Sequence, residues 1–117
     1  GKPEYIITTH ENLEPSVLFQ KFLDDAARSV CQKMVLRDLE ADEPPVLLPS
    51  NDSESSINPH LSDLIARFHS RTLDPSSRDL AQWRWLYDAS WFVSRDPAQA
   101  WNSVCVALFV HPDFYTY

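Results

Sequence analysis

The sequence predicts an all-α protein: a small four-helix bundle-like domain with an extended N-terminal arm, a long acidic Pro-rich loop and an aromatic C-terminal tail. Three observations predict this fold class. The one glycine among the 117 residues is Gly1, which excludes glycine-dependent hairpin turns and phosphate loops. Apolar residues recur at helical steps of three and four. Three Asx-Pro pairs, which favour helix starts, divide the second half of the chain.

The N-terminal third predicts an arm followed by a long helix. Residues 1–14 form the arm, because residues 5–9 are rich in β-branched side chains but have no matching strand partner. Pro15 and Ser16 are start signals for a helix over 15–39. The face predicted to be buried consists of Phe19, Phe22, Leu23, Ala26, Val30, Met34 and Val35.

Residues 40–57 interrupt the helical pattern and form the acidic loop. They hold three prolines, five acidic residues and no basic one, which accounts for most of the net charge of −7. The apolar anchor of this loop is the run Val46, Leu47 and Leu48. A solvated connector is the favoured interpretation, and a partner-recognition segment is the alternative.

The pairs Asn58-Pro59, Asp74-Pro75 and Asp96-Pro97 predict the starts of three further helices. In each pair the Asx oxygen can accept a free backbone N–H, and the fixed φ of proline suits the first turn. Pro112 is predicted to end the last helix after His111. The whole chain, residues 1–117, is expected to form a single domain.

Aromatic residues are unusually dense in the second half. Trp83, Tyr87 and Trp91 share one helical face, whereas Trp85 and Phe92 share a second. Two aromatic faces on one helix indicate a central position in the bundle, which is the favoured interpretation, or a partner interface. The tail residues Phe114, Tyr115 and Tyr117 are expected to pack back on the bundle or onto a partner.

Two cysteines, Cys31 and Cys105, lie within apolar helical patterns. Two buried free thiols are the favoured arrangement, and one disulfide between two helices of an exported protein is the alternative. The longest apolar run, residues 104–110, has seven residues, so no membrane span is predicted. The acidic balance argues against nucleic-acid binding.

Four histidines raise the question of metal or haem. His60 with Asp63, His69 and His111 are the candidates, but they form no standard ligand motif, so no cofactor is predicted. The absence of CxxCH argues against a covalent haem, and the absence of internal glycine excludes the G-x-S-x-G nucleophile motif. The sequence therefore favours a non-catalytic function.

The stretch from Trp83, Leu86 and Tyr87 through Asp96-Pro97 to His111-Pro112-Asp113-Phe114 carries a resemblance. Residues 60–117 are similar to helical modules of large exported planctomycete and myxobacterial proteins, which are often associated with c-type cytochrome domains. The resemblance implies a periplasmic or exported setting and a module attached to redox proteins. A cytoplasmic location is the alternative.

These observations favour a helical module that binds another protein or a larger parent chain, as an accessory part of an exported redox assembly. The expected contact residues are Trp85, Phe92, Phe114, Tyr115 and Tyr117. Removing residues 113–117 is expected to weaken association and to preserve helicity. Self-association is compatible with the same surface. The alternatives are a haem- or metal-binding electron-transfer protein that uses the bundle histidines, and a small hydrolase.

Overall fold

The computed structural model describes residues 15–40, 44–50 and 53–115, and these residues contain helices and no strand. The all-α prediction is therefore confirmed. The predicted arm, residues 1–14, lies outside the described residues, as do 41–43 and 51–52 of the acidic loop. In chain order the elements are α2 (Pro15–Glu40), the 3-10 turn η1 (Glu54–Ser56), α3 (Ile57–His69), α4 (Arg78–Ser94), α5 (Pro97–Val110) and α6 (Pro112–Tyr115).

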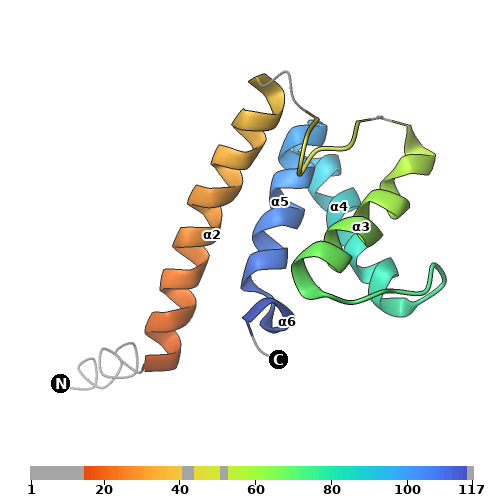
Figure 1. The fold of residues 1–117 in the computed structure, drawn as a ribbon. Helices are drawn as coiled ribbons and strands as arrows, with labels where there is room; N and C mark the ends of the chain where they lie inside the picture. Colours follow the sequence, from red (N-terminus) through yellow and green to blue (C-terminus); the bar gives the residue numbers. More distant parts are fainter. Residues whose placement is uncertain (1–14, 41–43, 51–52, 116–117) are drawn as a thin grey trace.

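Helix α5 lies at the centre of the molecule, with α2 on one side and α4 on the other (Figure 1). Its sequence is apolar around much of its circumference, which is typical of a helix surrounded by others. The favoured interpretation that the aromatic helix would be central is wrong, because α5 takes that place. The buried core cluster comprises Cys31, Leu47, Leu61, Leu64, Ile65, Leu80, Tyr87, Ala100, Trp101, Val104, Cys105 and Leu108.

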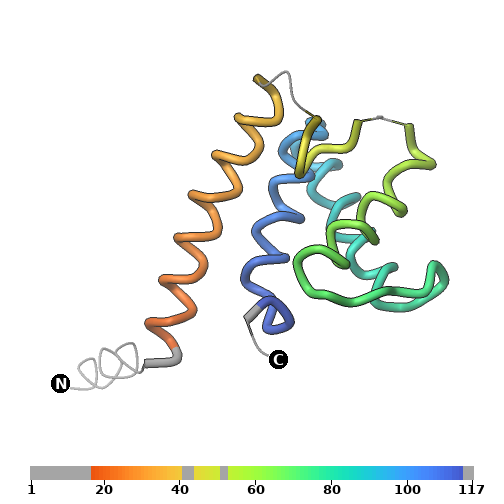
Figure 2. Tube along the Cα trace, viewed as in Figure 1, coloured from red at the N-terminus to blue at the C-terminus, as the bar shows by residue number. Residues whose placement is uncertain are grey.

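The long helix α2 packs at the edge of this body. Among the described helices it contacts α5, and the Cα trace shows it standing apart from α3 and α4 (Figure 2). None of the described helices is long and apolar enough to cross a membrane.

The buried face of α2 differs from the predicted one. The buried residues are Ala27 and Cys31, with Leu23, Met34 and Val35 partly covered. The predicted core residues Phe19, Phe22 and Val30 are exposed. The apolar surface of α2 is wider than one packing face, and contact with a single helix covers only part of it. The sequence pattern could not distinguish which part would be covered.

A disulfide joins Cys31 of α2 to Cys105 of α5, with a Cα–Cα distance of 5.9 Å. Both residues are fully buried, as their helical positions predicted. Of the two arrangements considered, the bridge is present, and the favoured pair of free thiols is wrong. The bridge links the edge helix covalently to the central one across 74 residues of sequence.

The three Asx-Pro pairs have three different roles. Asp96 caps α5 as predicted, since its carboxylate accepts the Ala98 N–H at 3.0 Å and Pro97 is the first helical residue. Asp74 instead closes a turn by accepting the Ser76 N–H at 2.8 Å, and α4 begins later at its cap, Ser77.

Asn58-Pro59 lies inside the first turn of α3, not at its start. The turn η1 leads directly into α3, so the helix begins one residue before the pair, after Ser56. Proline is tolerated there because the first backbone N–H groups of a helix have no partner within it.

Two helices end on left-handed residues that are not glycine. Ser70 after α3 and Arg95 after α4 have φ values of 57° and 58°. Their N–H groups bond to the carbonyl oxygens of Ala66 and Trp91, at 3.1 and 2.6 Å. A side chain in this conformation costs about 1 kcal/mol or more, which glycine would avoid.

We expect Ser70→Gly to raise the free energy of unfolding by about 1 kcal/mol, because the left-handed conformation suits glycine. Urea denaturation followed by circular dichroism measures this change. The matched control is Ser29→Gly, in the exposed middle of α2, which should lower the same quantity by about 0.5 kcal/mol. Destabilisation by Ser70→Gly would contradict the expectation.

The described part of the acidic loop is held by Asp38 of α2. Its carboxylate accepts the backbone N–H groups of Val46, Leu47 and Leu48 at 3.0, 2.7 and 2.9 Å. Burial alone would raise the pKa of Asp38, but these three bonds and the nearby Arg37 lower it below its ordinary value. Leu47 is fully buried, which agrees with the predicted anchor.

Candidate functional site

The candidate site lies along the outer side of α4, beside η1 and the start of α3. The α4 residues Leu80 and Tyr87 are buried in the core, and Trp83 is half-buried against it. The side chains of Trp85 and Phe92 are 70% and 67% exposed. The second aromatic face of α4 is therefore directed to solvent. Trp85 and Phe92 are seven residues apart, which places them about two helical turns from each other.

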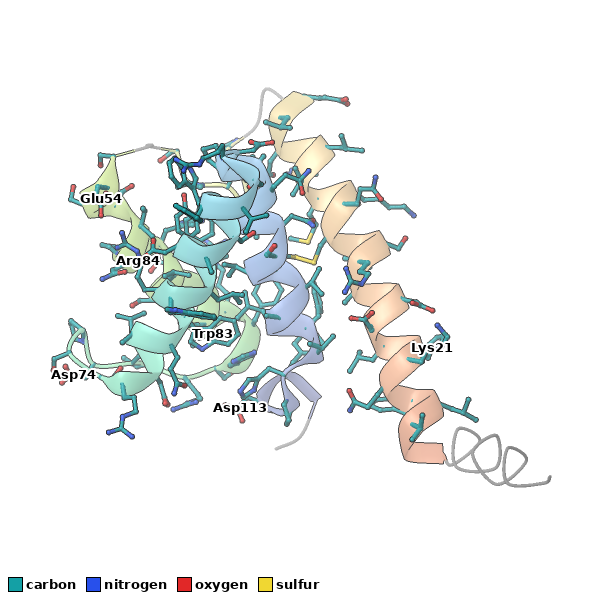
Figure 3. The ribbon with its side chains drawn as sticks, turned by 180° about the vertical axis from the view of Figure 1, so that it is seen from behind. Lys21, Glu54, Asp74, Trp83, Arg84 and Asp113 are labelled. Atoms are coloured by element: carbon teal, nitrogen blue, oxygen red, sulfur yellow. A yellow bond between two sulfur atoms is a disulfide. The ribbon has the colours of Figure 1, made fainter. Side chains whose placement is uncertain are left out.

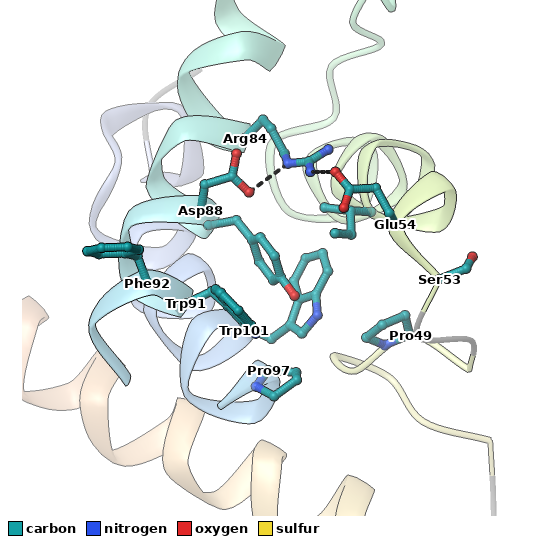
Figure 4. A pocket seen from close by; sticks show the side chains of 11 residues that line it. Pro49, Ser53, Glu54, Arg84, Asp88, Trp91, Phe92, Pro97 and Trp101 are labelled. Atoms are coloured by element: carbon teal, nitrogen blue, oxygen red, sulfur yellow. Dashed lines mark hydrogen bonds and ion pairs between the residues drawn. The ribbon is translucent and has the colours of Figure 1, made fainter. Parts of the chain in front are cut away.

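A pocket of about 510 Å³ opens next to this face (Figure 4). Its buried part includes the rings of Tyr87 and Trp101, whose centroids are 4.6 Å apart. Trp91 and Phe92 line it from α4. The pocket is lined by Pro49, Ser53, Glu54, Ile57, Arg84, Tyr87, Asp88, Trp91, Phe92, Pro97 and Trp101.

Arg84 forms a polar bridge across the pocket wall. Its guanidinium donates to Asp88 at 2.9 Å, to Glu54 at 2.7 Å and to Asn58 at 3.2 Å. Burial alone would lower the pKa of Arg84, but the bonds to Asp88 and Glu54 raise it above its ordinary value. The bridge links η1 and α3 to α4 and forms the polar edge of the pocket.

A second, more open hollow of about 390 Å³ lies on the other side of this bridge. Trp85 lines it together with Pro75 and Leu80, and Arg84 and Asp88 line both hollows. We call the two hollows together with Trp85, Trp91 and Phe92 the α4 surface.

Arg95 extends the α4 surface beyond the end of the helix. Its guanidinium lies 4.9 Å from the ring centre of Trp91 and 4.8 Å from that of Phe92. Such cation–π contacts hold the two rings in place while they remain exposed. Arg95 therefore restricts the positions that both rings can adopt.

His60 of α3 has a structural role. One of its ring nitrogens bonds to the carbonyl oxygen of Leu47 at 2.6 Å, and its ring lies edge-on to Trp101 at 4.8 Å. Asp63, its predicted companion, is exposed three residues further along α3. His60 therefore attaches the 44–50 segment to the core.

The other two candidate histidines come together. His69 ends α3 and His111 follows α5, and their ring centroids are 5.0 Å apart. Asp113 of α6 completes a cluster in which ligand atoms from the three residues lie within 4.8 Å of one another. The sequence candidates His69 and His111 are therefore neighbours, whereas His60 and Asp63 are not part of this cluster.

The structure describes the side chain of one of the three aromatic tail residues, Phe114. The ring of Phe114 packs on Phe109 at 4.8 Å and on Phe68 at 6.3 Å, so this predicted contact residue is half-buried within its own chain. The backbone of Tyr115 ends α6, but its side chain and the whole of Tyr117 lie outside the described residues. Packing on the bundle, one of the two alternatives for the tail, holds for Phe114.

The lining of the larger pocket bears on the hydrolase alternative. It includes two carboxylates, Glu54 and Asp88, both paired with Arg84, and no histidine. Nucleophilic catalysis needs a nucleophile hydrogen-bonded to a base, and the small-hydrolase alternative stays a prediction.

Fold and surface together define a small, disulfide-bridged, all-α domain that presents exposed aromatic side chains beside a pocket. No family model, curated protein or solved structure matches this chain.

Proposed function

We propose that this chain is a protein-binding module that receives a partner segment on the α4 surface. The observation that carries the proposal is the exposure of Trp85 and Phe92, each of which lines one of the two hollows. Trp and Tyr are typical anchors of protein interfaces, and such anchors pair with pockets on the opposite side. Contiguous exposed apolar patches with polar rims are typical of interaction sites.

The chemistry of the surface indicates what kind of segment it would bind. The larger pocket is walled by the rings of Tyr87, Trp91 and Trp101, so it suits an aliphatic or aromatic side chain. The chain carries a net charge of −7, and the pocket lining includes two carboxylates, Glu54 and Asp88. A partner segment with apolar anchors and flanking basic residues complements this surface.

The polar bridge supplies a second element of recognition. Glu54 is highly exposed, so its carboxylate can accept further donors while it is paired with Arg84. A partner backbone that crosses between the two hollows would meet Arg84, Asp88 and Glu54 in fixed positions. Polar groups held in this way orient a segment, whereas the aromatic hollows contribute most of the affinity.

A displayed library of random peptides tests the proposal with a defined probe. Selection on the immobilised, oxidised chain should enrich sequences that combine apolar and basic residues. The enriched peptides should bind the Trp85→Ala/Phe92→Ala variant at least about tenfold more weakly than the unchanged chain, as measured by titration. Truncating an interface anchor typically costs about 2 kcal/mol or more of binding free energy. Fluorescence of Trp91 and Trp101, which line the pocket, gives an independent readout.

The matched control is Phe22→Ser, which changes an aromatic residue of α2 that is 72% exposed but lies outside the α4 surface. It should leave peptide affinity unchanged. Two results would overturn the proposal: failure of the library to yield any binder, or peptides whose affinity falls in Phe22→Ser and is retained in Trp85→Ala/Phe92→Ala.

We also propose that the module works in an oxidising compartment, as a periplasmic or exported protein. The bridge between Cys31 and Cys105 supports this setting, because structural disulfides persist mainly outside the cytosol. Attachment to a redox assembly rests on the resemblance of residues 60–117 alone. A partner that carries a c-type haem would support it.

A further inference from the structure

The cluster of His69, His111 and Asp113 lies where three helices meet, apart from the polar bridge of the α4 surface. His69 is the last residue of α3, His111 joins α5 to α6, and Asp113 belongs to α6. In Figure 3 Asp113 lies at the α6 end of the molecule, on the opposite side of Trp83 from Arg84. Ligand atoms from the three residues lie within 4.8 Å of one another.

The hydrogen bond of His69 leaves one ring nitrogen ready to coordinate. Its Nε2 lies 2.9 Å from the carbonyl oxygen of Leu108, and the residue is 5% exposed. A carbonyl oxygen only accepts, so Nε2 carries the proton and the neutral ring keeps a lone pair on Nδ1. Metal-binding histidines are held in the same way, by donating their other ring N–H to a carbonyl or carboxylate.

His111 also has a lone pair on Nδ1. This nitrogen accepts the backbone N–H of Asp113 at 3.0 Å, which requires it to be unprotonated. The same nitrogen lies 3.9 Å from the Oδ2 atom of Asp113. A metal ion that coordinates Nδ1 of His111 would displace the backbone N–H of Asp113 from this lone pair.

The electrostatic surroundings favour a cation. The C-terminal ends of α3 and α5, which are the negative ends of their dipoles, both lie at this cluster. Arg71 bonds to Asp113 at 2.9 Å and to Asp79 at 2.8 Å. Arg71 shares one positive charge between two carboxylates, so the three groups together keep a net charge of about −1, and the guanidinium holds the Asp113 carboxylate in position.

We propose that His69, His111 and Asp113 bind a divalent transition-metal ion of the zinc type. Two imidazole nitrogens and one carboxylate oxygen form a donor set that Zn²⁺ prefers, and water completes the coordination. Zn–N and Zn–O distances of about 2.0–2.2 Å bring ligand atoms to within about 3.5 Å of one another, so the cluster must tighten. Binding would draw α6 toward the end of α3.

Titration calorimetry with ZnCl₂ on the full, oxidised chain at pH 7.5 tests this proposal. We expect one ion per chain and a rise in the thermal midpoint, because the site exists only in the folded state. Affinity should fall as the pH is lowered, because protons and a metal ion compete for the same ligand atoms. Neither cysteine can contribute, since the two are bonded to each other.

A paramagnetic probe locates the ion. The ring of Trp83 lies 5.8 Å from that of His69 and 5.9 Å from that of His111. Co²⁺ should therefore quench part of the tryptophan emission, and Zn²⁺ should reverse the quenching. Trp83→Phe should remove most of the Co²⁺ effect.

His111→Gln and Asp113→Asn are the diagnostic variants, because both avoid the buried bond of His69 to Leu108. Each should weaken Zn²⁺ binding at least tenfold. The controls are His60→Gln, at the other candidate histidine, and His10→Gln, each of which should bind as the unchanged chain does. The proposal would be overturned if the chain did not bind Zn²⁺ at 1 mM, or if both diagnostic variants bound it with undiminished affinity. Neither result would affect the proposal of peptide binding.

Discussion

Replacing both bridged cysteines, Cys31→Ala/Cys105→Ala, should lower the free energy of unfolding by about 4 kcal/mol. The bridge closes a long loop, with 74 residues of sequence separation, and its main effect is to restrict the unfolded chain. Without the bridge, α2 is held by its packing on α5, the one described helix that it contacts, and by the bonds of Asp38 to the 44–50 segment. Urea denaturation followed by circular dichroism at 222 nm measures the loss.

The same change should uncouple α2 from the rest of the molecule. We expect helicity to be lost at lower urea concentration than the change in tryptophan emission, because all four tryptophans lie in α4 and α5. Reduction of the unchanged chain with dithiothreitol is the control and should reproduce both effects. A loss of less than 1 kcal/mol, or coincident transitions, would show that packing alone secures α2.

Asp38→Asn should lower the free energy of unfolding by about 3 kcal/mol. The carboxylate accepts three backbone N–H groups, and its side chain is 1% exposed, so solvent cannot replace it. Hydrogen bonds to charged groups contribute about 1.5–3 kcal/mol each, and an amide retains only part of them. The matched control is Asp63→Asn, an exposed aspartate of α3, which should change stability by less than about 0.5 kcal/mol.

The same carboxylate should make the fold sensitive to acid. The pKa of Asp38 in the folded chain lies below its ordinary value of 3.8, so its contribution is complete above that value. The contribution is lost as the pH falls from 3.8 toward the lower folded pKa. The stability of Asp38→Asn should therefore depend less on pH in this range. Parallel pH profiles of the two proteins would contradict this assignment.

Helix positions were largely predictable because they depend on nearby residues. The predicted helix over 15–39 corresponds to Pro15–Glu40, and the capping role of Asp96 is as expected. Asp74 caps a turn instead, since Ser77 lies three residues later and makes an equivalent cap for α4. Competition between neighbouring capping residues is decided by the path of the chain, which local sequence does not specify.

The candidate sites were predictable only in part. Helical spacing separated Trp85 and Phe92 from the inward face of α4, but it could not show whether another helix would cover them. The pocket was not predictable, because Pro49, Glu54, Arg84 and Trp101 are brought together from four separate segments. Arg84 and Arg95, two cations close to the aromatic residues in sequence, are the kind of local signal that could indicate it.

The amino-acid sequence by itself determined that the protein is helical, where its helices lie and that both cysteines are buried. These properties follow from periodicity and backbone propensity, which act over a few residues. Only the tertiary structure decided that α5 is central, that Cys31 meets Cys105, and that His69 and His111 adjoin Asp113. These contacts depend on which of several apolar helix faces pack together, and that choice depends on the apolar surface that the whole chain can bury.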